Sequence, residues 1–71
     1  MIRILNAEPS NYSSNARSLL EEIGELREEE CSRERLLELL PEFDVLIVRL
    51  GHRVDEKLLM RAPRLRVVVT A

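Results

Sequence analysis

Polar and charged side chains follow three of the apolar segments of this chain, at the positions where those segments end. They are Asn6 and Glu8, then Arg49, Gly51, His52 and Arg53, and finally Thr70. The guanidinium groups of Arg49 and Arg53 can hold an anion such as a carboxylate, and Gly51 lets backbone N–H groups approach that anion. The pattern therefore predicts a small anion site on the loop that contains Arg49 and Gly51.

His52 and Cys31 are the single histidine and the single cysteine. A histidine in a loop can transfer protons near neutral pH, but no carboxylate at a recognisable spacing orients His52, so we interpret it as an exposed side chain. Cys31 has no lysine or histidine close to it in sequence, which predicts an inert thiol near the start of a helix. One cysteine also excludes a disulfide within the chain and favours a reducing compartment.

Two further motifs are interpreted as structural. The charged run at residues 27–30 (REEE) is expected to be a solvated edge and not a metal site, because adjacent glutamates in an extended chain point to alternate faces. Gly24 and Gly51 stand alone, so the chain has no glycine-rich phosphate loop. We therefore expect these residues to bind no metal and no nucleotide.

The composition is that of one small globular domain. The 71 residues are 45% hydrophobic and 34% charged, and a net charge of −2 with mixed signs excludes the basic field that nucleic acids require. The longest apolar run lies around Val45–Val48, far short of a membrane span, and Met1 leads directly into a strand-like segment. We expect a cytoplasmic protein that binds neither nucleic acid nor membrane.

The elements that must position these residues alternate regularly along the chain. Strands are predicted at residues 2–5, 25–30, 45–48 and 65–70, and helices at 11–23, from Ser32 to Pro41, and from Asp55 to Pro63. Ser32 and Asp55 are expected to cap their helices, and the two prolines to end them.

Each helix and strand is predicted from the pattern of its apolar residues. The first helix is predicted from an apolar face formed by Tyr12, Ala16, Leu19, Leu20 and Ile23, and Gly24 is expected to end it in the left-handed conformation. The second helix has a leucine stripe at positions 36, 37, 39 and 40, and the third carries leucines at 58 and 59 with an alanine at 62. The segment 25–30 is so polar that it can be only an edge strand, whereas 45–48 is apolar throughout and should be central.

Strict alternation of strands and helices predicts an α/β fold with a parallel sheet and helices on both faces. With the polar strand at an edge, the favoured strand order is 2-1-3-4, that of a partial flavodoxin-like domain. Ligands of such sheets bind beyond the carboxyl ends of the strands, which is why the residues after the strands are the candidates.

The strongest similarity to a known family lies in three segments, residues 44–49 (DVLIVR), 54–59 (VDEKLL) and 62–68 (APRLRVV). They resemble the D-isomer-specific 2-hydroxyacid dehydrogenases of the phosphoglycerate dehydrogenase type. Ile4-Leu5 with Glu8-Pro9, and the helix end at Leu40-Pro41, are weaker parts of the same resemblance, which covers nearly the whole chain.

The resemblance implies a role for one loop. It makes residues 1–71 a single partial domain, the start of a substrate-binding lobe, and it places Arg49, Leu50 and Gly51 at the substrate, which would be a small 2-hydroxy or 2-oxo acid. The family often has a serine after this arginine, whereas Leu50 stands here, which argues against a phosphate-bearing substrate.

The resemblance also implies what this segment lacks. The parent would be an NAD- or NADP-dependent oxidoreductase, but the family's nucleotide-binding domain and catalytic residues lie beyond Ala71. We therefore expect the 71 residues to bind no cofactor, to contain no catalytic residue and to be inactive alone.

Two other functions remain as alternatives. A stand-alone, non-catalytic interaction domain would share this fold. A receiver-type signalling module shares the strand order but needs an aspartate where Arg49 stands, and acidic residues where Asn6 and Ala7 stand. For the isolated chain, the apolar edge strand at residues 65–70 predicts self-association, as a two-fold dimer with antiparallel edge pairing or as less ordered aggregates.

Overall fold

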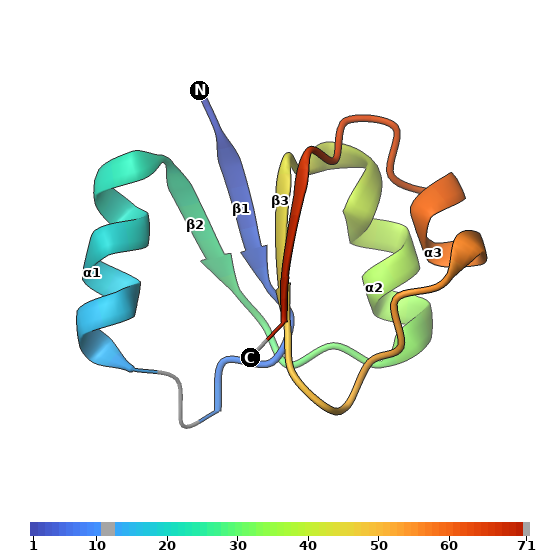
Figure 1. The fold of residues 1–71 in the computed structure, drawn as a ribbon, viewed down its shortest axis with the longest axis horizontal. Helices are drawn as coiled ribbons and strands as arrows, with labels where there is room; N and C mark the ends of the chain where they lie inside the picture. The colour runs from blue at the N-terminus through green and yellow to red at the C-terminus, as the bar shows by residue number, and fades with distance from the viewer. Residues whose placement is uncertain (11–12, 71) are drawn as a thin grey trace.

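The computed structural model describes residues 1–10 and 13–70. Figure 1 shows the elements in chain order. They are β1 (Arg3–Asn6), α1 (Ser14–Ile23), β2 (Glu25–Glu28), α2 (Arg33–Leu39), a short 3₁₀ turn (Leu40–Glu42), β3 (Val45–Val48), α3 (Glu56–Met60) and β4 (Val67–Thr70). The predicted alternation of strands and helices is confirmed.

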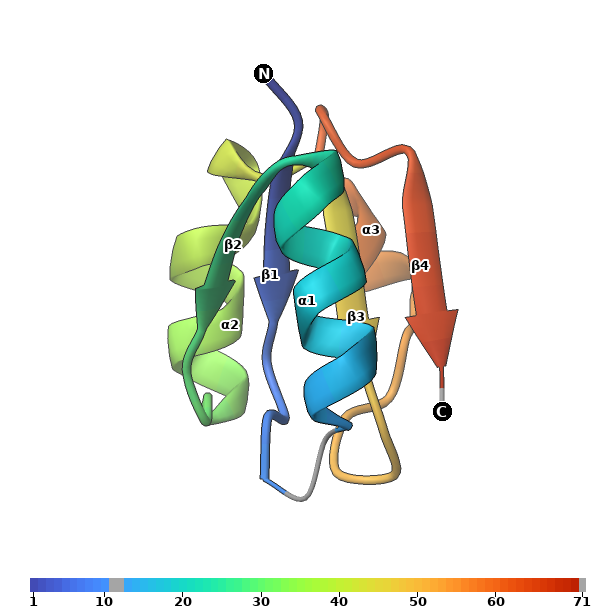
Figure 2. The ribbon, with the colours of Figure 1, turned by 90° about the vertical axis from the view of Figure 1, so that its left-hand side faces the viewer.

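The four strands form one parallel sheet in the order β2-β1-β3-β4. Figure 2 shows α1 in front of the sheet and both α2 and α3 behind it, so the helices cover both faces. The predicted class and strand order are therefore correct. The polar strand β2 is at one edge, and the apolar β3 lies between β1 and β4.

Most of the core lies between the sheet and the helices α2 and α3. Leu5, Leu46 and Val48 from the sheet pack with residues of these helices and of the 3₁₀ turn, all of them buried. The members from the helical side and the loops are Ala7, Leu36, Leu39, Leu40, Phe43, Leu58 and Ala62. The predicted leucine stripe therefore packs against the sheet, with Leu36 and Leu39 buried in α2, Leu40 buried in the 3₁₀ turn and Leu37 partly buried.

The face covered by α1 is thinner. Ile4 and Ile47 are buried in the sheet, but no residue of α1 is fully buried, and Leu19 and Ile23 are more than half exposed. Only Ala16 and Leu20 of the predicted apolar face are partly covered, and Tyr12 lies outside the described residues. The predicted helix is correct, but the burial of its whole apolar face is not.

The predicted left-handed stop at Gly24 is wrong. Gly24 has φ −169° and ψ −165°, which is an extended conformation open to any residue. Its N–H donates to the Leu20 carbonyl, and the next residue enters β2 directly. Glycine is required here for a different reason, since a Cβ would lie 2.3 Å from the backbone oxygen of Ile2.

The caps of the second and third helices are as predicted. The Ser32 hydroxyl accepts from the Arg35 N–H, and the Asp55 carboxylate accepts from the Leu58 N–H. These bonds satisfy backbone donors that the first turn of a helix leaves free. Among the described residues, none of the helices has the length and apolar character needed to cross a bilayer.

Candidate functional site

The loops that follow β1 and β3 lie together beyond the carboxyl ends of those strands, at the lower end of the sheet in Figure 1. The two strands pair in parallel, with Asn6 opposite Ile47. The Ala7 N–H donates to the Ile47 carbonyl, which extends this pairing by one residue. Residues separated by about 40 positions in sequence are thereby brought into contact.

Glu8 is the residue that joins these two loops. One oxygen of its carboxylate accepts the backbone N–H of Arg49, and the other accepts the backbone N–H of Gly51 at 2.9 Å. The Glu8 N–H in turn donates to the Asn6 side-chain oxygen at 3.1 Å. The backbone amides that the sequence analysis offered to a ligand are therefore bound to a carboxylate of the chain itself.

A hollow of about 190 Å³ opens beside this contact, and it is lined by Glu8, Ser10, Glu30, Arg49 and Leu50. The Arg49 guanidinium donates to the Ser10 carbonyl at 2.9 Å, and the Ser10 N–H donates to the Glu30 carboxylate at 2.7 Å. The hydrogen bonds from Ser10 hold the pKa of Glu30 below its ordinary value, and the charge of Arg49 acts in the same direction. The hollow thus contains two carboxylates and one guanidinium.

Leu50 and Gly51 lie on the outer turn of the same loop. Leu50 is 98% exposed, and Gly51 is exposed as well. Of the three predicted substrate-binding residues, Arg49 and Leu50 line the hollow, while Gly51 contributes its amide to Glu8.

His52 is not the plainly exposed side chain that we expected. Its Nε2 lies 2.9 Å from the Cys31 carbonyl oxygen, and the side chain is half-buried. Because a carbonyl oxygen only accepts, Nε2 must carry the proton of this bond. His52 therefore fastens the loop after β3 to the segment before α2.

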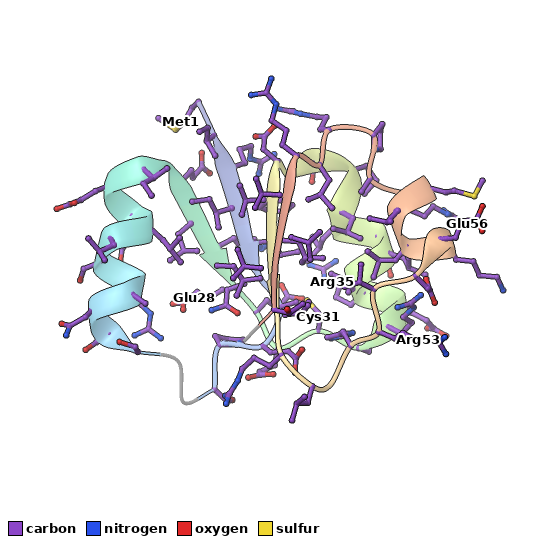
Figure 3. The ribbon with its side chains drawn as sticks, in the orientation of Figure 1. Met1, Glu28, Cys31, Arg35, Arg53 and Glu56 are labelled. Atoms are coloured by element: carbon purple, nitrogen blue, oxygen red, sulfur yellow. The ribbon has the colours of Figure 1, made fainter. Side chains whose placement is uncertain are left out.

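The surroundings of Cys31 disfavour its thiolate form, which agrees with the expectation of an inert thiol. The thiol donates to the Glu29 carbonyl at 3.2 Å, and partial burial, followed by the charge of Glu29, raises its pKa. A raised pKa leaves little thiolate at neutral pH, and the thiolate is the nucleophilic form. Figure 3 shows Cys31 near the lower end of the sheet.

The glutamates of the charged run each have a partner of their own. Glu28 pairs with Arg17 and Glu29 pairs with Arg35, each at 2.7 Å, while Glu30 accepts from Ser10. No group of three metal-ligating side chains occurs in residues 1–10 and 13–70. Glu28 and Glu29 therefore form ion pairs beside the edge strand β2, whereas Glu30 contacts the loop after β1 and lines the hollow instead of forming part of a solvated edge.

Besides Gly51 and His52, three further candidates from the sequence do not line the hollow. Asn6 is fully buried as the last residue of β1, and its Nδ2 has no hydrogen-bond partner within the described part of the chain. The Arg53 carbonyl accepts from Arg33 at 2.6 Å, beside an ion pair of Arg33 with Asp55 at 2.7 Å. Thr70 ends β4 and is exposed.

Sequence reasoning missed Ser10 and Glu30 altogether, and it named Glu8 without its partners. The sequence places Glu30 in a charged run whose adjacent glutamates are expected to point to alternate faces of an exposed edge, and nothing local marks its contact with Ser10, 20 positions away. One sequence signal could have revealed the contact of Glu8 with Gly51, since a glutamate follows the central strand β1 and an isolated glycine follows the central strand β3. The carboxyl ends of neighbouring parallel strands lie side by side, so residues that follow them can come into contact.

Comparison with known proteins agrees with this architecture. Residues 4–71 match the family described as D-isomer specific 2-hydroxyacid dehydrogenase, catalytic domain. A glyoxylate reductase from Pyrococcus furiosus is 40% identical over 58 aligned positions, which cover 76% of this chain and 17% of that protein.

A solved structure shows the same fold. The crystal structure of the PH0520 protein from Pyrococcus horikoshii OT3 superposes with a TM-score of 0.87 at 20% identity, over 99% of this chain and 21% of that one. The chain therefore spans about a fifth of the length of either relative, 17% of the first and 21% of the second.

Proposed function

The chain belongs to the D-isomer specific 2-hydroxyacid dehydrogenase family, and we propose that it supplies the substrate-facing loop of an NAD(P)-dependent oxidoreductase that interconverts 2-hydroxy and 2-oxo acids. The observation that carries the proposal is the position of Arg49. Its guanidinium lines a hollow beyond the carboxyl ends of two central strands, where open parallel sheets bind their ligands.

In the proposed enzyme Arg49 and Leu50 contact the substrate, and Gly51 shapes the loop. The guanidinium of Arg49 attracts the carboxylate of a small 2-oxo acid, and the exposed Leu50 side chain offers it an apolar contact. Glyoxylate is the first substrate to test, given the name of the Pyrococcus furiosus relative. We propose that residues 1–71 form one partial domain, with the nucleotide-binding domain and the catalytic residues elsewhere in the protein.

The described residues do not fit a dinucleotide. The two backbone amides of the loop after β3 are already bound to the Glu8 carboxylate, which would repel a pyrophosphate. The other glycine, Gly24, lies against the Ile2 backbone and opens no loop. The hydride that reduces the 2-oxo acid would therefore come from a cofactor held by other parts of the enzyme.

We expect Arg49→Ala to impair the intact enzyme more than His52→Ala does. Loss of a guanidinium that faces a substrate carboxylate should lower kcat/KM for glyoxylate about 10- to 100-fold, because a charged hydrogen bond contributes roughly 1.5–3 kcal/mol. His52 binds the Cys31 carbonyl and should affect kcat/KM less. Steady-state reduction of glyoxylate by the two variants decides this, and equal kcat/KM values would contradict the assignment of Arg49.

We expect the 71-residue chain alone not to bind NADH. The backbone amides of Arg49 and Gly51, which lie where an open parallel sheet binds its ligands, are bound to Glu8 and are not free for the cofactor phosphates. Titration of NADH fluorescence should give no saturable change at micromolar protein concentrations. Saturable binding would overturn the proposal that the cofactor lies in another domain.

Self-association through β4 is our proposal for the isolated chain. Val67 and Val69 are 49% and 40% exposed at the edge of the described sheet, whereas Val68 packs against the core. Val69→Lys should therefore give a monomer with an unchanged circular dichroism spectrum, since it adds a charge to the edge without touching the core. Sedimentation should show a dimer or larger species for the wild type, and a folded monomer at high micromolar concentration would contradict the idea.

The same exposed edge favours the second candidate, a stand-alone interaction domain without activity. The two candidates are separated by the intact protein's ability to reduce a 2-oxo acid. A cytoplasmic location and a homo-oligomeric enzyme belong to the first proposal. The lone, half-buried thiol of Cys31 is suited to a reducing compartment.

A further inference from the structure

We propose that Glu8 is an internal anion that fills the backbone amides of the loop after β3 and so excludes a second anionic group of a substrate from that loop. The consequence for the substrate rests on the proposed function. The hydrogen bonds between Glu8 and the two loop amides do not depend on that function.

The contact has the geometry of a small anion site. Two N–H groups, from Arg49 and Gly51, converge on the two oxygens of one carboxylate. Backbone N–H groups that converge within one turn are typical of the concave loops that bind anions in proteins. Here the anion is the side chain of Glu8, in the loop that follows the neighbouring strand β1.

Both partners are built for this contact. A Cβ on Gly51 would lie 2.6 Å from Oε1 and 3.2 Å from Cδ of Glu8, so the carboxylate occupies the space directly beside this glycine. On the other side, the Glu8 N–H is held by the side-chain oxygen of the fully buried Asn6. The backbone from which the Glu8 side chain extends is therefore held at the end of β1.

The charges around the hollow also disfavour a second anionic group of a substrate. Glu8 and Glu30 carry two negative charges against the single positive charge of Arg49, which leaves a formal excess of one negative charge on the lining. A phosphate in the hollow could not bind the two amides, because Glu8 already accepts from them, and the Glu30 carboxylate would repel it. The substrate class is therefore a 2-oxo acid whose only charged group is its carboxylate, with Arg49 as the remaining donor.

Removal of the Glu8 carboxylate should create an anion site in the loop. We would record the amide signals of Arg49 and Gly51 by NMR for the wild-type chain, Glu8→Ala and Glu30→Ala, while adding sodium acetate or inorganic phosphate at constant ionic strength. In Glu8→Ala both signals should move downfield and saturate, with apparent affinity at least about tenfold above that of the wild type, because two free N–H groups can then bind the added anion. Glu30→Ala removes the same charge from the same hollow but leaves the amides filled, so it should respond like the wild type.

Two results would overturn the proposal. One is a folded Glu8→Ala chain whose Arg49 and Gly51 signals do not respond to either anion. The other is an equal response in Glu30→Ala, which would mean that overall charge and not occupancy controls the loop.

If Glu8→Ala does not fold, Glu8→Gln tests the same contact. The neutral amide oxygen of Gln is a weaker acceptor, so the Arg49 and Gly51 amide protons should move upfield relative to the wild type, whereas in Glu30→Gln they should not. Unchanged signals in Glu8→Gln would refute the contact. None of these measurements depends on enzymatic turnover. If the intact protein reduces no 2-oxo acid, the proposed function is refuted, but the NMR result on the contact of Glu8 with the loop is unaffected.

Discussion

Gly24→Ala is expected to destabilise the chain by about 2–3 kcal/mol, the upper part of the range for overpacking a closed site. The added Cβ would lie 2.3 Å from the Ile2 carbonyl oxygen and 3.1 Å from the Ile2 carbonyl carbon. That oxygen accepts the Glu25 N–H at 2.8 Å, at the point where β2 begins to pair with β1. Backbone on both sides must therefore shift, and the shift disrupts the edge of the sheet.

Gly51→Ala is the matched control. Its Cβ would meet the end of the Glu8 side chain, which can rotate away, and so the loss should stay below about 1 kcal/mol. Urea denaturation followed by circular dichroism measures both variants. A Gly24→Ala chain as stable as the wild type would show that the approach of Gly24 to Ile2 is looser than the structure has it.

A second large effect is expected at Phe43. This ring is 1% exposed, belongs to the main core cluster and lies under the Arg3 guanidinium, 4.9 Å from the ring centroid. Phe43→Ala should cost about 3–5 kcal/mol through lost burial and the cavity that remains. A chain of 71 residues is stable by only about 4–10 kcal/mol, so the variant should be close to unfolding at room temperature.

Leu50→Ala is the control for this variant, because Leu50 is 98% exposed and its truncation should change the unfolding free energy by no more than about 0.5 kcal/mol. The urea midpoints of the two variants should differ widely. Similar midpoints would mean that the ring does not contribute to the core as its burial indicates.

The site was predictable in part. Arg49 could be placed correctly because the apolar run at Val45–Val48 had to be a central strand, and the residue after such a strand faces the ligand edge of the sheet. The role of Glu8 could not be inferred, because its partners are 41 and 43 residues away and no local pattern records that separation. His52 was misjudged for the same reason, since its partner, the Cys31 carbonyl, is a backbone group that no sequence pattern marks.

Local sequence patterns were sufficient to predict the alternation of elements, the caps at Ser32 and Asp55, the edge position of β2 and the central position of β3. These follow from local propensity and from hydrophobic periodicity, which are properties of neighbouring residues. Tertiary structure alone decided the extended conformation of Gly24, the exposure of much of α1 and the capture of the loop amides by Glu8. Each of these depends on which backbone and side-chain groups meet across the sheet, and parallel pairing brings together residues whose distance along the chain carries no signal.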